Sequence, residues 1–248
     1  MNKPTRRLFN HSVLSSLLTY SVLETMFTGD VFADAVKPIT ASWLGNLSEL
    51  SGDLKGKELT AIQWQSEVEK LMKQVDLPEL LKFVDFEKLK ASVKLKDRGE
   101  QSFRPKFPEV EGLPNRLVFG HQFFAVKKGA SVVPHGHNNM ATAFLVLQGN
   151  FHGRHYDRIE DTDTHMIIKP TIDGTFEAGG FSTVSDEKDN VHWFKGNGDV
   201  GYIFNIHVLS VNPGRTGRVY IDPDGEKLPG GRVKAKRIST KEAYAKFG

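Results

Sequence analysis

Two histidines, His135 and His137, stand one residue apart at the start of a hydrophobic run that continues to Leu147. Side chains alternate between the two faces of an extended strand, so both imidazoles are expected to point to the same side. Two imidazoles that converge on one point are a metal-site geometry. Gly129 and Gly149 bracket this segment and predict the turns to the neighbouring strands of a sheet.

The composition limits which other chemistry is available. The chain has 248 residues and no cysteine, so a metal must be held by histidine, carboxylate, amide or water. The net charge is only +3. The one basic cluster, residues 232–237, is expected to be a solvated edge and not a nucleic-acid surface. We therefore expect one main domain that binds no nucleic acid.

The N-terminus has the pattern of an export signal. The paired Arg6 and Arg7 precede a moderately apolar run over residues 12–27 and an Ala-Asp-Ala sequence at 33–35. This order resembles a twin-arginine signal and predicts that residues 1–35 are a signal peptide of a periplasmic or exported protein. Alternatively, the leucines of the apolar run belong to an amphipathic helix of a cytoplasmic protein. Neither interpretation predicts a membrane-spanning segment in the mature protein, because such a helix needs about 20 apolar residues.

Residues 36–114 are expected to form a helical segment followed by a linker. Apolar side chains recur there at the spacing of one buried helix face, at Val68, Leu71, Met72 and Val75. Asp76 is expected to cap a further helix. The stretch Asp97–Pro114 is rich in glycine and proline, which predicts a linker.

Residues 115–248 have the pattern of a β-barrel. About ten short β runs separated by turns, with almost no helix between them, favour an antiparallel jelly-roll barrel. The first predicted strand is Leu117–Phe119 and the longest is Tyr202–Val211. Ser239 is expected to cap a short closing helix. The predicted fold is therefore mainly β, with an α-helical segment before the barrel.

The spacing of the histidine segment fits the first motif of the cupin superfamily. Gly129-x5-His135-x-His137-x11-Gly149 reproduces that motif, except that Ala141 and Thr142 stand where cupins usually carry a glutamate. A third histidine, His192, follows in the segment 189–194. The departure points to a cupin subgroup with three histidines and no carboxylate ligand.

Three segments together resemble the thiol dioxygenases of the cysteamine dioxygenase and plant cysteine oxidase type. They are His135–Met140, Gly149–Asp157 and Asn190–Phe194. The resemblance implies that His135, His137 and His192 bind Fe(II). It also implies that a small substrate, expected to be a thiol, and dioxygen take the open positions of the iron. An open site of neutral ligands suits this chemistry because both reactants must bind the iron side by side.

Two departures from that family concern the surroundings of the metal. Asn138 and Asn139 replace a Pro-Gly pair and are expected to donate hydrogen bonds into the site. Asn205 stands where the family carries an acidic residue, and His207 shares its strand face. Asn205 and His207 are therefore the candidate catalytic residues, with His207 as a donor beside the ligands or a fourth ligand.

The same residues are compatible with other functions. Three histidines around an open position also suit Zn(II) or Mn(II) in a hydrolase, lyase or isomerase, and a ligand-binding cupin without turnover is a third hypothesis. Exposed β edges make a homodimer reasonable. The remaining histidines of the barrel are expected to be packed or solvated: His121, His152, His155 and His165.

Overall fold

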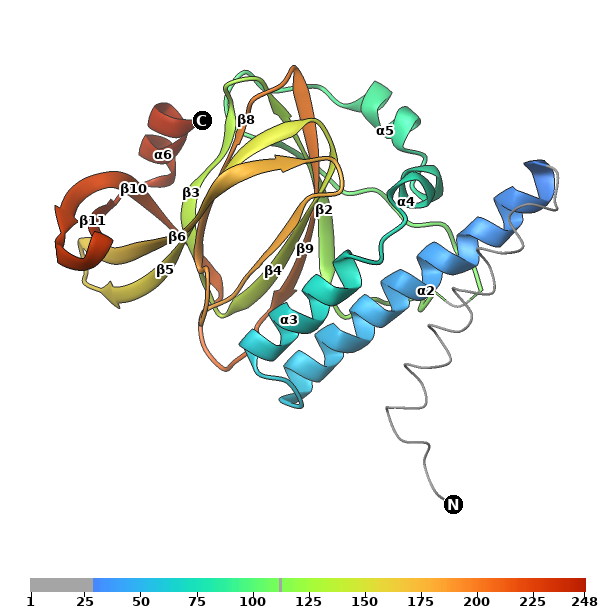
Figure 1. Ribbon diagram of the computed structural model, residues 1–248, viewed down its shortest axis with the longest axis horizontal. Helices are drawn as coiled ribbons and strands as arrows, with labels where there is room; N and C mark the ends of the chain where they lie inside the picture. The colour runs from blue at the N-terminus through green and yellow to red at the C-terminus, as the bar shows by residue number, and fades with distance from the viewer. Residues whose placement is uncertain (1–28, 112) are drawn as a thin grey trace.

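The computed structural model describes residues 29–111 and 113–248. Within these ranges four helices precede the strands and one follows them: α2 (Gly29–Gly56), α3 (Ala61–Met72), α4 (Leu77–Phe83), α5 (Phe86–Ser92) and α6 (Thr240–Phe247). In Figure 1, α2 and α3 lie side by side along the barrel, and α6 lies on the far side next to the C-terminus. No helix within the described ranges combines the length and hydropathy that a membrane crossing requires.

Two antiparallel sheets form the barrel. The first has the order β1 (Gln101–Phe103), β2 (Gly120–Lys127), β9 (Val200–Leu209), β4 (Met140–Gln148), β7 (Phe181–Val184). The second closes in the order β10 (Gly217–Leu228), β11 (Arg232–Arg237), β6 (His165–Glu177), β5 (Asn150–Asp161), β8 (Val191–Gly196), β3 (Ser131–Asn138), with β3 pairing back onto β10. A single 3-10 turn, Pro229–Gly231, joins β10 to β11. The predicted antiparallel jelly-roll barrel after a helical segment is confirmed.

The apolar side chains divide into an outer and an inner core. The outer core lies between the helices and the first sheet, and it includes Trp43, Trp64, Phe123 and Phe204. The inner core fills the space between the two sheets with side chains that include Phe144 and Phe194. The alternation of strand residues explains this division, because successive side chains of β2, β4 and β9 face opposite cores.

Both predicted helix caps are confirmed. The Asp76 side chain accepts a hydrogen bond from the backbone N–H of Glu79 at 3.0 Å at the start of α4. Ser239 and Glu242 form a reciprocal capping box at the start of α6. These short polar side chains satisfy backbone donors that a first helical turn leaves without partners.

Three details of the predicted strands are corrected. The run Leu117–Phe119 is not a strand, because the N–H of Val118 donates to Ser48 Oγ of α2 instead of to a neighbouring strand. The predicted linker contains β1, which pairs with β2. The basic residues 232–237 form β11, whose Arg237 pairs with Asp161 at 2.7 Å.

The predicted signal peptide lies mostly outside the described residues. Arg6, Arg7 and the apolar run fall in residues 1–28, and residues 29–35 are the first turns of α2.

Candidate metal centre

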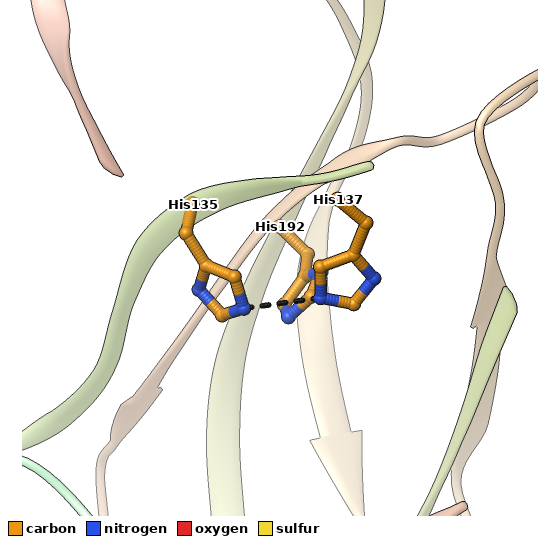
Figure 2. A group of neighbouring side chains, drawn as sticks. All are labelled: His135, His137 and His192. Atoms are coloured by element: carbon orange, nitrogen blue, oxygen red, sulfur yellow. Dashed lines mark hydrogen bonds between the residues drawn. The ribbon is translucent and has the colours of Figure 1, made fainter. Parts of the chain in front are cut away.

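The structure brings His135, His137 and His192 together in the interior of the barrel. One ring nitrogen from each of them lies within 4.8 Å of the other two. Figure 2 shows the three rings converging from two neighbouring strand segments. All three residues are at most 2% exposed, so the cluster is closed to bulk water.

The register of β3 and β8 explains this convergence. His135 and His137 lie on the same face of β3, and His192 of β8 lies directly opposite His135. Residues directly opposite one another in an antiparallel pair share a face. A register shift between Val132 and His135 precedes this contact, and such an irregularity re-aims side chains next to a site.

Asn190 fixes the backbone of β3 at the second histidine. Its Oδ1 accepts a hydrogen bond from the His137 N–H at 3.2 Å, and its Nδ2 donates to the His137 carbonyl at 2.9 Å and to the Ser185 carbonyl at 2.9 Å. A Cβ on Gly136 would lie 2.8 Å from Asn190 Oδ1. A residue larger than glycine between the two histidines would therefore push this side chain away.

The three imidazoles are neutral at pH 7. Burial is the main cause that lowers the pKa of each of them well below its ordinary value, and the positive charge of Arg218 lowers all three further. His135 Nδ1 donates to the Val133 carbonyl at 2.7 Å. Its Nε2 therefore presents a lone pair to the cluster, which is the form in which histidine binds a metal.

The geometry fits a single metal ion. His135 Nε2 and His137 Nε2 lie 3.2 Å apart, close to the separation of about 3 Å expected for two nitrogens at about 2.0–2.1 Å from a common ion. His192 Nδ1 is buried and has no hydrogen-bond partner among the described residues, a state that native structures rarely leave unexplained. No carboxylate joins the cluster in the part of the chain that the structure describes.

Thr142 is one of the two residues that stand where cupins usually carry a glutamate, and it lies next to the cluster. Its Oγ1 lies 3.3 Å from His137 Nδ1, and the side chain is 1% exposed. With Nδ1 protonated, His137 donates to this hydroxyl and keeps its Nε2 free for a ligand. Thr142 therefore orients the second histidine and is not itself in the cluster.

Asn205 and His207 both face the barrel interior but lie outside the cluster. In the pairing of β9 with β4, His207 is opposite Thr142 and Asn205 is opposite Phe144, whose ring centroid lies 4.7 Å from that of His192. Asn205 Nδ2 lies 3.4 Å from His207 Nδ1. Burial, followed by nearby arginines, lowers the pKa of His207 to about 4. Their catalytic role stays a prediction.

Asn138 and Asn139 bind loops and strands around the site, not the histidine cluster. Asn139 has a left-handed φ of 55°, and its Nδ2 donates to the Asn212 carbonyl at 2.7 Å. Asn138 Oδ1 accepts from Arg158 Nη1 at 2.6 Å. The expectation that these amides donate into the site is therefore wrong for Asn139, whose Nδ2 donates to the Asn212 and Gly214 carbonyls, and it stays a prediction for Asn138.

Two residues beside the cluster were not predicted to belong to the site, although His155 was expected to be packed. His155 of β5 lies directly opposite His192 and is fully buried, with Nδ1 lacking a partner and Nε2 3.3 Å from Ser182 Oγ. Arg218 of β10 lies directly opposite His137. His155 is buried and Arg218 is partly exposed, and both come close to the cluster through strand pairing between distant segments, which residue spacing along the chain does not reveal.

The other histidines behave as predicted. His121 Nε2 lies 2.9 Å from the Pro105 carbonyl, and the ring stacks on Phe107. His152 pairs with Asp173 and is partly exposed.

No protein-family model matches this sequence, and no curated protein matches it. Among solved structures, the chain is similar to an uncharacterized conserved protein with a double-stranded beta-helix domain from Klebsiella pneumoniae, at 14% identity over 52% of this chain and 85% of that one, with a TM-score of 0.34. A cupin superfamily protein from Desulfitobacterium hafniense is 14% identical over 49% of this chain and 87% of that one, with a TM-score of 0.32. Procruciferin, an 11S globulin from Brassica napus, is 11% identical over 41% of this chain and has a TM-score of 0.31. The chain spans only 22% of procruciferin. All three scores are low, and the fold described above rests on the strand order of this chain.

Proposed function

We propose that this protein is a metal-dependent cupin that binds Fe(II) through His135, His137 and His192 and acts as a dioxygenase-like oxidoreductase on a small substrate. The observation that carries the proposal is a buried cluster of three neutral imidazoles, which no carboxylate joins within residues 29–111 and 113–248. Iron bound there would supply the oxidative chemistry. The chain itself would orient the ligands and exclude bulk water from the reaction.

The first test is metal uptake. His192→Ala removes one of three ligands and is expected to abolish stoichiometric binding of Fe(II) under anaerobic conditions, measured by metal analysis after desalting. His152→Ala is the matched control, since His152 lies outside the cluster and pairs with Asp173. Equal iron content in the two variants would reject the metal centre.

The second test concerns the reaction. Iron-loaded protein is expected to consume oxygen with cysteamine, cysteine or a peptide with an N-terminal cysteine. No uptake by fully loaded protein with all three would reject a thiol substrate. If protein expressed without added metal contains stoichiometric zinc or manganese instead of iron, a Lewis-acid hydrolase, lyase or isomerase replaces the oxidative proposal.

We further propose that the protein is exported in a folded state through its twin-arginine sequence. Replacement of Arg6 and Arg7 by lysine is expected to retain the protein in the cytoplasm, as cell fractionation would measure. An unchanged distribution would reject the signal.

A further inference from the structure

Arg218 is a charged residue on the same face as the proposed metal ligands. On β10 it lies directly opposite His137 of β3, and Tyr220 lies opposite His135. The rings of Tyr220 and His135 are 5.8 Å apart between centroids, so this part of β10 is in side-chain contact with the cluster. Because directly opposed residues share a face, the Arg218 side chain is directed toward the interior that holds the histidines.

The guanidinium group of Arg218 has unused donors. Its ionic partner is Glu100, and the distance from Nη1 to Glu100 Oε1 is 4.0 Å, too long for a hydrogen bond. That carboxylate oxygen already accepts a hydrogen bond from the Tyr244 hydroxyl at 2.8 Å. Among the described residues, the Arg218 side chain makes no hydrogen bond, and it is 29% exposed, so solvent and solutes reach it.

The charge around the cluster favours an anion. The three histidines are neutral, and among the described residues no carboxylate joins them, so a bound divalent metal would add two positive charges near Arg218, whose own charge is paired with Glu100 at 4.0 Å. The influence of Arg218 on the pKa values of all three histidines agrees with this proximity. A planar guanidinium with free N–H groups matches the two oxygens of a carboxylate.

We propose that Arg218 binds the carboxylate of the substrate, so that the protein acts on small carboxylic acids whose other end reaches the three-histidine centre. The proposal rests on the proposed function for the position of the reacting end. When no substrate is bound, the Glu100 carboxylate holds the Arg218 guanidinium in place by electrostatic attraction across 4.0 Å. This selectivity for carboxylates differs from that of enzymes that accept only a simple amine such as cysteamine.

Two thiols of similar size and opposite terminal charge test this selectivity. 3-Mercaptopropionate and cysteamine would be titrated by calorimetry into zinc-loaded protein, which binds thiols without turnover. Wild type is expected to bind 3-mercaptopropionate about tenfold more tightly than cysteamine, equivalent to about 1.4 kcal/mol. Arg218→Gln is expected to lose this preference, and Arg218→Lys to keep part of it because the charge remains.

Arg215→Gln is the matched control, since Arg215 is exposed and lies three positions away on the preceding loop. The proposal is overturned if Arg218→Gln keeps the same preference as Arg215→Gln, or if wild type shows none. If Arg218→Gln does not fold, the comparison of Arg218→Lys with Arg215→Gln decides. Failure of wild type to hold zinc would reject the metal centre alone, and the same titrations into metal-free protein would then test Arg218 separately.

Discussion

Each histidine of the cluster can use one ring nitrogen as a ligand, and the partner of the other nitrogen determines which one. His135 is fixed by the carbonyl of Val133 and His137 by the hydroxyl of Thr142. His192 Nδ1 has no partner. The rings of His135 and His137 are therefore oriented before a metal binds, whereas His192 relies on packing against Phe144.

Thr142→Val tests the orienting hydrogen bond without changing the size of the side chain. Loss of such an outer partner typically lowers metal affinity by about 10–100-fold, and we expect a decrease in that range. A competition titration against a chromophoric chelator would measure it. Thr142→Ser keeps the hydroxyl and is expected to bind the metal about as tightly as wild type. Equal affinity of the Val and Ser variants would contradict this role of Thr142.

His155 predicts how the stability of the metal-free protein depends on pH. Burial lowers its pKa to about 3 in the folded state, whereas an unfolded chain binds the proton near pH 6.5. The stabilising contribution is therefore complete above about pH 6.5 and is lost as the pH falls toward 3. The slope is about 1.4 kcal/mol per pH unit for one histidine.

Urea unfolding of metal-free protein between pH 7 and pH 5 would measure this slope. His155→Gln removes one titrating group, so its free energy of unfolding should fall less steeply with acid than that of wild type. Parallel slopes for the two proteins would mean that His155 takes up its proton in the folded state too.

The clustering of His135, His137 and His192 could be predicted from the sequence, but their surroundings could not. The alternation of a strand places His135 and His137 on one face, and the motif order identifies His192. Arg218 and Thr142 reach the cluster through the pairing of β10 and β4 with other strands. Which strands pair depends on packing of the whole barrel, and local spacing contains little information about it.

The position of β3 depends on the side chain of Asn190, which forms hydrogen bonds to the backbone as a neighbouring strand would. Asn190 bonds both the N–H and the carbonyl of His137. It is 1% exposed, so a shorter side chain would remove the buried partner of the His137 N–H and of the Ser185 carbonyl, whereas the His137 carbonyl keeps its bond from Arg158 Nη1 at 3.0 Å. Such groups each cost about 1–3 kcal/mol.

Asn190→Ala is therefore expected to lower the free energy of unfolding by at least about 2 kcal/mol and to weaken metal binding in parallel. Urea unfolding and the chelator titration would measure the two effects. Asn197→Ala is the control, because Asn197 is exposed and, among the described residues, its side chain bonds only Asn150. If Asn197→Ala lowered the free energy of unfolding and the metal affinity by similar amounts, the effect of Asn190→Ala would not depend on its bonds to His137.

The elements themselves were partly predictable. Period-two alternation correctly indicated strands such as β4 and β9, where one face packs on the helices and the other on the interior. The same alternation wrongly predicted a strand at Leu117–Phe119. That run buries Phe119 in the outer core, but its backbone bonds α2. β11 was missed because its alternating lysines and arginines resemble a solvated edge, although Ala235 is fully buried.

At the scale of the whole molecule, a chain of buried hydrogen bonds joins the helical segment to the metal centre. Ser185 Oγ donates to Gln65 Oε1 of α3 at 2.7 Å, and Gln65 Nε2 donates to Thr183 Oγ1 at 3.3 Å. The Ser185 carbonyl in turn accepts from Asn190, which bonds His137. The helices therefore do more than cover the outer core, because they support the loop that positions a ligand.

Gln65→Ala should reveal this connection at a distance from the site. The variant removes the acceptor of the buried Ser185 hydroxyl and one of the two partners of Thr183, which keeps its bond to Glu69, so the free energy of unfolding should fall by about 1–3 kcal/mol. Metal affinity should fall by about 0.5–2 kcal/mol, the range found for residues that act on a site without touching it. Ser66→Ala, on the exposed face of the same helix, is the control for both measurements. If Gln65→Ala destabilises the fold while metal affinity equals that of the control, the helical segment stabilises the barrel without orienting His137.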